Sequence, residues 1–150
     1  KSGMIMSMMP YEGTWKYGLS AKGSYSALSC YYLTFVDEKF AKEQYTKLKE
    51  NFYQKRPIAG FKEYYDRKCR LGFDIDAGPI IFNLSPTGTA FGLGAATYFE
   101  DYKTRNGFLK TAELAGFTVS RNEERHYLLA NIALVGEAIA LAMRTAVKWE

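Results

Sequence analysis

Two carboxylates one residue apart are the part of the sequence best suited to chemistry. Asp74 and Asp76 stand shortly before a break at Gly78 and Pro79. Alternate residues of an extended chain point to the same side, so both carboxylates can face one ligand. One carboxylic acid with a raised pKa beside an ionised carboxylate is the arrangement that cleaves glycosides. The spacing therefore predicts Asp74 and Asp76 as catalytic residues.

In this mechanism Asp76 is the acid, and Asp74 is kept ionised by Arg70. Three apolar neighbours in the sequence are expected to bury Asp76: Phe73, Ile75 and Phe82. Burial raises a carboxyl pKa because it penalises the charged form. The acids of glycosidases usually come from separate segments, so Glu12 or Glu63 stays open as the partner carboxylate. The structural alternative is that Asp76 caps a turn while Asp74 only pairs with Arg70.

Aromatic residues make up 16% of the chain, and twelve of them are tyrosines. Such rings line sugar and lipid sites, although they also serve as ordinary boundary residues with one dry face and one wet end. We expect them to bind a neutral polyol, saccharide or isoprenoid-like alcohol together with the acids. The predicted ligand-binding residues are Tyr11, Glu12, Trp15, Tyr17, Tyr25, Phe73 and Asn83.

Composition argues against several other functions. The net charge is a mild +4, and the basic stretch 47–70 contains acids, which indicates a solvated face rather than a nucleic-acid site. One histidine and two cysteines without CxxC spacing predict neither a metal nor a cofactor, and the pairing of Cys30 with Cys69 stays open. The apolar stretch 128–143 is shorter than the roughly 20 residues of a membrane span.

The apolar spacing predicts about five helices and no strand, because no alternating run of strand length occurs. The first expected helix covers residues 21–35, and the second and third begin after the caps Asp37 and Ser85. The fourth runs from Asp101 or Thr104 to Gly116. The fifth begins at the cap Asn122 and has His126 in its first turn. Residues 60–78 are expected to be irregular.

The third and fifth expected helices are apolar nearly all round, whereas the second is amphipathic. Small residues at Gly88, Gly92 and Ala96 would let a neighbouring helix approach the third one closely. Inner and outer helices in succession predict an all-α fold of helical hairpins, an α/α toroid or a fragment of one. Because the chain begins at Lys1 without methionine, we expect residues 1–150 to be one domain at the C-terminal end of a longer protein, with any targeting segment upstream.

Four runs, 17–30, 40–49, 74–79 and 89–96, resemble a poorly characterised bacterial family. Its proteins resemble six-hairpin α/α toroids, the architecture also used by linalool dehydratase-isomerase and many glycosidases. The resemblance spans about residues 11–96 and rests chiefly on Asp-Ile-Asp-Ala-Gly-Pro at 74–79. It implies a ligand-binding or carboxylate-dependent domain, a hydrolase or lyase, without an established reaction. The alternative is a non-catalytic helical module that serves structure or protein interaction.

Overall fold

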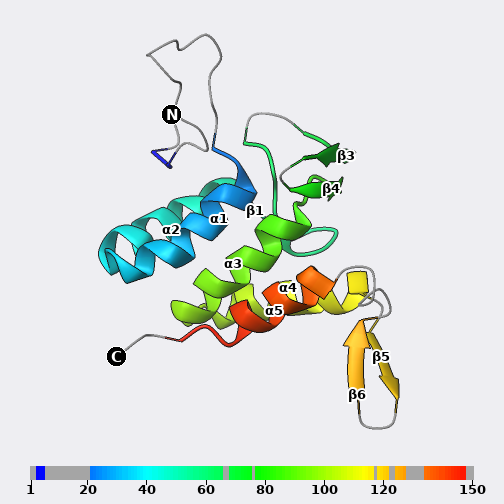
Figure 1. Cartoon of the computed structure of the whole chain (residues 1–150). Coiled ribbons are helices and arrows are strands. Elements are labelled where there is room, and N and C mark those ends of the chain that lie inside the picture. Colours follow the sequence, from blue (N-terminus) through cyan, green and yellow to red (C-terminus); the bar gives the residue numbers. More distant parts are fainter. Residues whose placement is uncertain are drawn as a thin grey trace.

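The computed structural model describes residues 3–5, 21–65, 68–75, 77–116, 118–121, 124–127 and 134–147. Within them the chain forms five α-helices, one 3-10 turn and three two-stranded antiparallel sheets (Figure 1). The prediction of an all-α toroid is therefore wrong, because the fold mixes helices and strands. The strands are two to four residues long, too short for an alternating pattern to stand out in the sequence.

The first two helices form a hairpin. Helix α1 spans Gly23–Tyr32 and runs into a 3-10 turn, η2, at Leu33–Phe35; helix α2 spans Glu38–Phe52. The predicted cap of α2 is confirmed, since the Phe40 N–H donates to Asp37 Oδ1 at 2.9 Å. One face of α2 is buried, as the amphipathic pattern of its sequence predicts.

Two short hairpins replace the irregular stretch expected at residues 60–78. Strand β1 (Tyr53–Gln54) pairs with β2 (Gly60–Phe61). Strand β3 (Leu71–Asp74) pairs with β4 (Gly78–Ile81), with Leu71 opposite Ile81 and Asp74 opposite Gly78. The β3–β4 hairpin stands at the edge of the helical body in Figure 1.

Helix α3, Pro86–Tyr98, lies at the centre of the fold and contacts α1, α4, α5 and β2. Its predicted start is confirmed: Pro86 occupies the first turn, and the Gly88 N–H donates to Ser85 Oγ at 2.9 Å. A Cβ atom on Gly88 would lie 3.0 Å from the Ser24 backbone nitrogen, so this glycine lets α1 approach closely, as its spacing predicts. The core surrounds α3 and includes an edge-to-face pair of rings, Phe61 and Phe108, 5.0 Å apart.

The C-terminal part agrees with the prediction in α4 and differs from it after Gly116. Helix α4, Tyr102–Gly116, begins where Asp101 Oδ1 accepts the Thr104 N–H at 3.2 Å. Strands β5 (Thr118–Arg121) and β6 (Glu124–Tyr127) then pair, and α5 begins only at Leu134 and ends at Arg144. The expected helix start at Asn122 is wrong, because His126 belongs to a strand and pairs with Val119. No helix among the described residues has the length and apolar character needed to cross a membrane.

Candidate functional site

Helices α1 and α3 begin side by side, and the chain after β2 passes between their first turns. The Gly23 N–H donates to the Glu63 carbonyl oxygen at 2.9 Å, and the Ser85 N–H donates to the Phe61 carbonyl oxygen at 2.8 Å. A β-bridge joins Lys22 to Tyr64. Two helix N-termini, each with a partial positive charge, therefore meet at one place, which we call the polar junction: Lys22, Ser24, Glu63, Tyr64, Asp74 and Ser85.

Glu63 is the fully buried carboxylate of the polar junction. Its Oε1 accepts the Ser24 hydroxyl at 2.8 Å, and its Oε2 accepts the Ser24 N–H at 3.2 Å. The N-cap residue of α1, Lys22, provides no side-chain cap, so Glu63 caps this helix from a distant segment. Burial raises the pKa of Glu63 against the opposing hydrogen bonds from Ser24 and Ser85, and the nearby charge of Asp74 raises it further.

Asp74 is the second carboxylate of the polar junction, and hydrogen bonds from three other described residues hold it. Lys22 Nζ lies 3.1 and 3.0 Å from its two oxygens, the Tyr64 hydroxyl donates to Oδ2 at 2.8 Å, and the Ala77 N–H donates to Oδ1 at 3.3 Å. The Lys22 and Asp74 side chains remain 21% and 11% exposed. The prediction that Asp74 pairs with Arg70 is wrong, because its ion-pair partner is Lys22. The β-bridge between Lys22 and Tyr64 brings Lys22 close to Asp74, since the Tyr64 hydroxyl bonds to the same carboxylate.

The structure brings together only part of the predicted ligand site. Lys22 Nζ lies 5.9 Å from the centre of the Tyr25 ring, which places Tyr25 next to Asp74. The Asn83 carbonyl oxygen accepts the Glu63 N–H at 3.2 Å, and Asn83 Oδ1 is buried with no hydrogen-bond partner among the described residues. Phe73 is exposed and does not join them, because neighbouring residues of a strand face opposite sides and Asp74 faces inward.

The remaining predicted residues lie outside the described part of the chain: Tyr11, Glu12, Trp15, Tyr17 and Asp76. The three residues that were expected to form an apolar pocket around Asp76 do not form one. Phe73, Ile75 and Phe82 are all exposed, so they do not bury a carboxylate among themselves. Among the described residues, burial raises the pKa of Glu63, which the sequence left open as a partner carboxylate.

Three residues of the polar junction escaped the sequence reasoning: Lys22, Ser24 and Tyr64. One signal was available, since position 22 begins a helix with lysine, which cannot accept a hydrogen bond from the first turn. A helix without its own cap must find an acceptor elsewhere. The sequence does not say that Glu63, 39 residues away from Ser24, supplies it.

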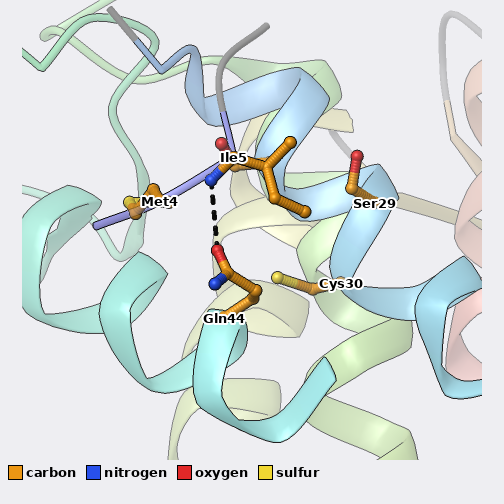
Figure 2. Close-up of a pocket in the computed structure, with 6 residues that line it drawn as sticks. Met4, Ile5, Ser29, Cys30 and Gln44 are labelled. Atoms are coloured by element: carbon orange, nitrogen blue, oxygen red, sulfur yellow. Dashed lines mark hydrogen bonds between the residues drawn. The ribbon is translucent and has the colours of Figure 1, made fainter. Parts of the chain in front are cut away.

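Cys30 faces a narrow crevice between α1, α2 and residues 3–5 (Figure 2). The Ile5 N–H closes it by donating to Gln44 Oε1 at 3.2 Å, and no water molecule fits inside. Burial raises the pKa of the Cys30 thiol to about 12, which keeps it protonated and a poor nucleophile. Cys30 and Cys69 are both free thiols, and no group of three or more metal-ligating side chains occurs among the residues that the structure describes.

An open groove of about 410 Å³ lies between α2 and the corner that joins α3 to α4. Its floor is the stacked pair Tyr45 and Phe99, with ring centres 5.5 Å apart. Lys49 pairs with Asp101, which also accepts the Tyr45 hydroxyl at 3.0 Å. Partial burial would raise the pKa of Asp101, but the hydrogen bonds from Lys49, Thr104 and Tyr45 outweigh it and lower the pKa to about 2. These charged groups pair with each other and stabilise the corner, so Lys49 and Asp101 keep little hydrogen-bonding capacity for a ligand.

Comparison with known proteins adds no assignment: no family model, no curated protein and no solved structure matches this chain. The resemblance to a toroid family therefore stays a prediction.

Proposed function

We propose that this chain is a binding domain for a small, neutral, hydroxylated ligand, a polyol or a saccharide, with Asp74 and Lys22 as its polar contacts. The observation that carries the proposal is the partly exposed ion pair between these two side chains. A hydroxyl group both donates and accepts, so it can accept a hydrogen bond from the ammonium and donate to a carboxylate oxygen in place of one of the two Lys22 contacts. Because the two charges compensate each other, the pair favours a neutral ligand over an ion.

The surroundings of the pair support this choice. Tyr64 and the Ala77 N–H hold the Asp74 carboxylate, so little side-chain freedom remains to be lost on binding. The Tyr25 ring beside Lys22 offers an apolar surface on which the C–H groups of a sugar can pack. The site thus combines an acceptor, a donor and a ring within a small area.

Binding without chemistry is the function that the geometry favours. A general acid must reach its substrate within hydrogen-bond distance. Glu63, whose raised pKa would suit such an acid, is fully buried, and Ser24 bonds to both of its oxygens. Glu63 therefore supports the site without touching a ligand: its hydrogen bonds with Ser24 hold the backbone close to Lys22 and to Tyr64 in place.

The test is ligand-detected NMR with the intact chain and a panel of neutral probes: glucose, galactose, cellobiose, myo-inositol and glycerol. We expect at least one probe to bind, and Asp74→Asn to weaken that binding by about tenfold or more, since a hydrogen bond to a charged group contributes about 1.5–3 kcal/mol. Asp37→Asn is the matched control, because Asp37 is exposed and asparagine also caps helices.

Two results would overturn the proposal. Either none of the probes binds the wild-type chain, or Asp74→Asn retains wild-type affinity while its melting temperature is unchanged. If Asp74→Asn lowers the melting temperature, Tyr64→Phe provides the second variant. It removes one hydrogen bond to Asp74 and leaves the ion pair with Lys22 in place, so it is expected to weaken binding by about threefold to tenfold; unchanged binding in this variant also counts against the site.

A further inference from the structure

The β3–β4 hairpin turns an apolar face to the outside. Leu71, Phe73 and Ile75 are 82%, 75% and 92% exposed. Leu71 and Phe73 alternate along β3 and share one side, Ile75 follows in the turn directly after β3, and the residues opposite Leu71 and Phe73 on β4 are Ile81 and Pro79. The other side faces inward, where Ile80 is fully buried. A surface hairpin usually places polar residues outward, so a contiguous apolar face marks an interaction surface.

Phe82 extends this face from an unfavourable backbone conformation. It adopts φ +53° and Asn83 adopts φ +68°, in a two-residue turn closed by backbone hydrogen bonds between Ile81 and Leu84. Such turns favour Asn and Gly at these positions, and a bulky residue there is an outlier. An exposed phenylalanine kept in this conformation at the edge of the apolar face points to a use for its ring.

Around the apolar face, the exposed charges of the described residues have one sign. Among the described residues from 53 to 83, the exposed charged side chains are all basic: Lys55, Arg56, Lys68 and Arg70. Of the acids that the structure describes in this region, Glu63 is withdrawn by burial and Asp74 by its pairing with Lys22, whereas Asp66 and Asp76 lie outside the described residues. Gln54 Nε2 donates to the Phe82 carbonyl oxygen at 2.9 Å, which brings the 53–56 segment to the base of the face.

We infer that the β3–β4 hairpin docks the domain onto an anionic membrane surface. Leu71, Phe73 and Ile75 would enter the boundary between headgroups and acyl chains, while the basic rim contacts the negative headgroups. A second copy of the chain fits less well, because pairing the same face would bring like charges together. The hairpin stands at the edge of the fold in Figure 1, where it can meet a flat surface. This inference is independent of the ligand at Asp74.

Sedimentation with phosphatidylcholine vesicles, with and without phosphatidylglycerol, tests the inference on the intact chain. We expect binding only when phosphatidylglycerol is present, and weaker binding as the salt concentration rises. The double variant Phe73→Ser with Ile75→Ser should bind about tenfold more weakly or worse, because both side chains lose apolar contact. Arg70→Glu should weaken binding about fivefold or more.

Matched controls use exposed residues elsewhere. Val36→Ser removes an apolar side chain that is 84% exposed in the turn before α2, and Lys103→Glu reverses an exposed charge on α4. Both should bind as the wild type does. Equal binding to vesicles without phosphatidylglycerol overturns the inference, and so does equal weakening by the controls. Unchanged vesicle binding by the double variant also overturns the inference. So does a wild-type chain that does not bind vesicles but self-associates, if the double variant abolishes that self-association.

Discussion

Replacing Glu63 with alanine is expected to lower the free energy of unfolding by about 3–5 kcal/mol. The carboxylate accepts the Ser24 N–H at 3.2 Å and the Ser24 hydroxyl at 2.8 Å, and the Ser85 hydroxyl also bonds to it. Each buried polar group that loses its partner costs about 1–3 kcal/mol, and α1 loses its cap as well. For a chain of this size, such a loss lowers the melting temperature by about 10 °C.

Glu63→Gln is the matched variant, because glutamine keeps the size and one acceptor oxygen but cannot ionise. Burial raises the pKa of Glu63 in the folded state, so the folded chain retains a proton that the unfolded chain has already released. The stability from this difference is fully present below the unfolded pKa of about 4.3 and is lost as the pH rises through the folded pKa. The wild type should therefore lose stability relative to Glu63→Gln as the pH rises above about 4.

Urea denaturation of the three proteins between acid and neutral pH measures both effects. Groups far from Glu63 titrate alike in the wild type and in Glu63→Gln. The change with pH in the stability difference between these two proteins therefore reports on Glu63 and on its coupling to Asp74. A difference that stays constant across this range would refute the assigned pKa direction. An alanine variant within about 1 kcal/mol of the wild type would refute the capping role.

Two further predictions concern the corner at Asp101 and the first turn of α1. The pKa of Asp101 is lowered to about 2, so its contribution is present above the unfolded value near 4 and is lost as the pH falls through 2. Asp101→Asn, which keeps the cap but not the charge for Lys49, should cost about 1 kcal/mol at neutral pH and progressively less as the pH falls toward 2, by urea denaturation. A Cβ atom on Gly23 would lie 1.8 Å from the Lys62 carbonyl oxygen, so Gly23→Ala should cost about 3 kcal/mol or prevent folding despite the better helix propensity of alanine. The control is Gly107→Ala, whose Cβ would lie 3.1 Å from the Ala59 methyl carbon and 3.6 Å from the Tyr53 hydroxyl oxygen; it should change the melting temperature by only a few degrees in a thermal scan.

The sequence was reliable where the determinants of structure are local. Asp37 and Ser85 each bond to a backbone N–H three residues later, so a short window contains the whole cap, and both helix starts were predicted correctly. The strand β6 was hidden because residues 124–127 precede an apolar run with helical spacing, and only pairing with β5 makes them a strand.

The candidate site could be predicted only in part for the same reason. Asp74 stands out by its own sequence, but its partner was taken to be the nearby Arg70. The fold supplies Lys22, which is 52 residues away in the sequence. Glu63 could be named as a possible partner carboxylate, yet its burial follows from the approach of α1 and α3, which no local pattern reveals.

The cap that Glu63 provides has a consequence for the order in which the chain can fold during its synthesis. Helix α1 has ten residues and no side-chain cap of its own, so in isolation it is marginal. Helix α2 has fifteen residues and its own cap at Asp37, and every group that starts it is present once its sequence is made. A nascent chain that has not yet reached Glu63 lacks the acceptor for the first turn of α1. We therefore expect α1 to become stable only after the chain has been synthesised as far as Glu63. Helix α2 would then form before α1, although α1 is translated first.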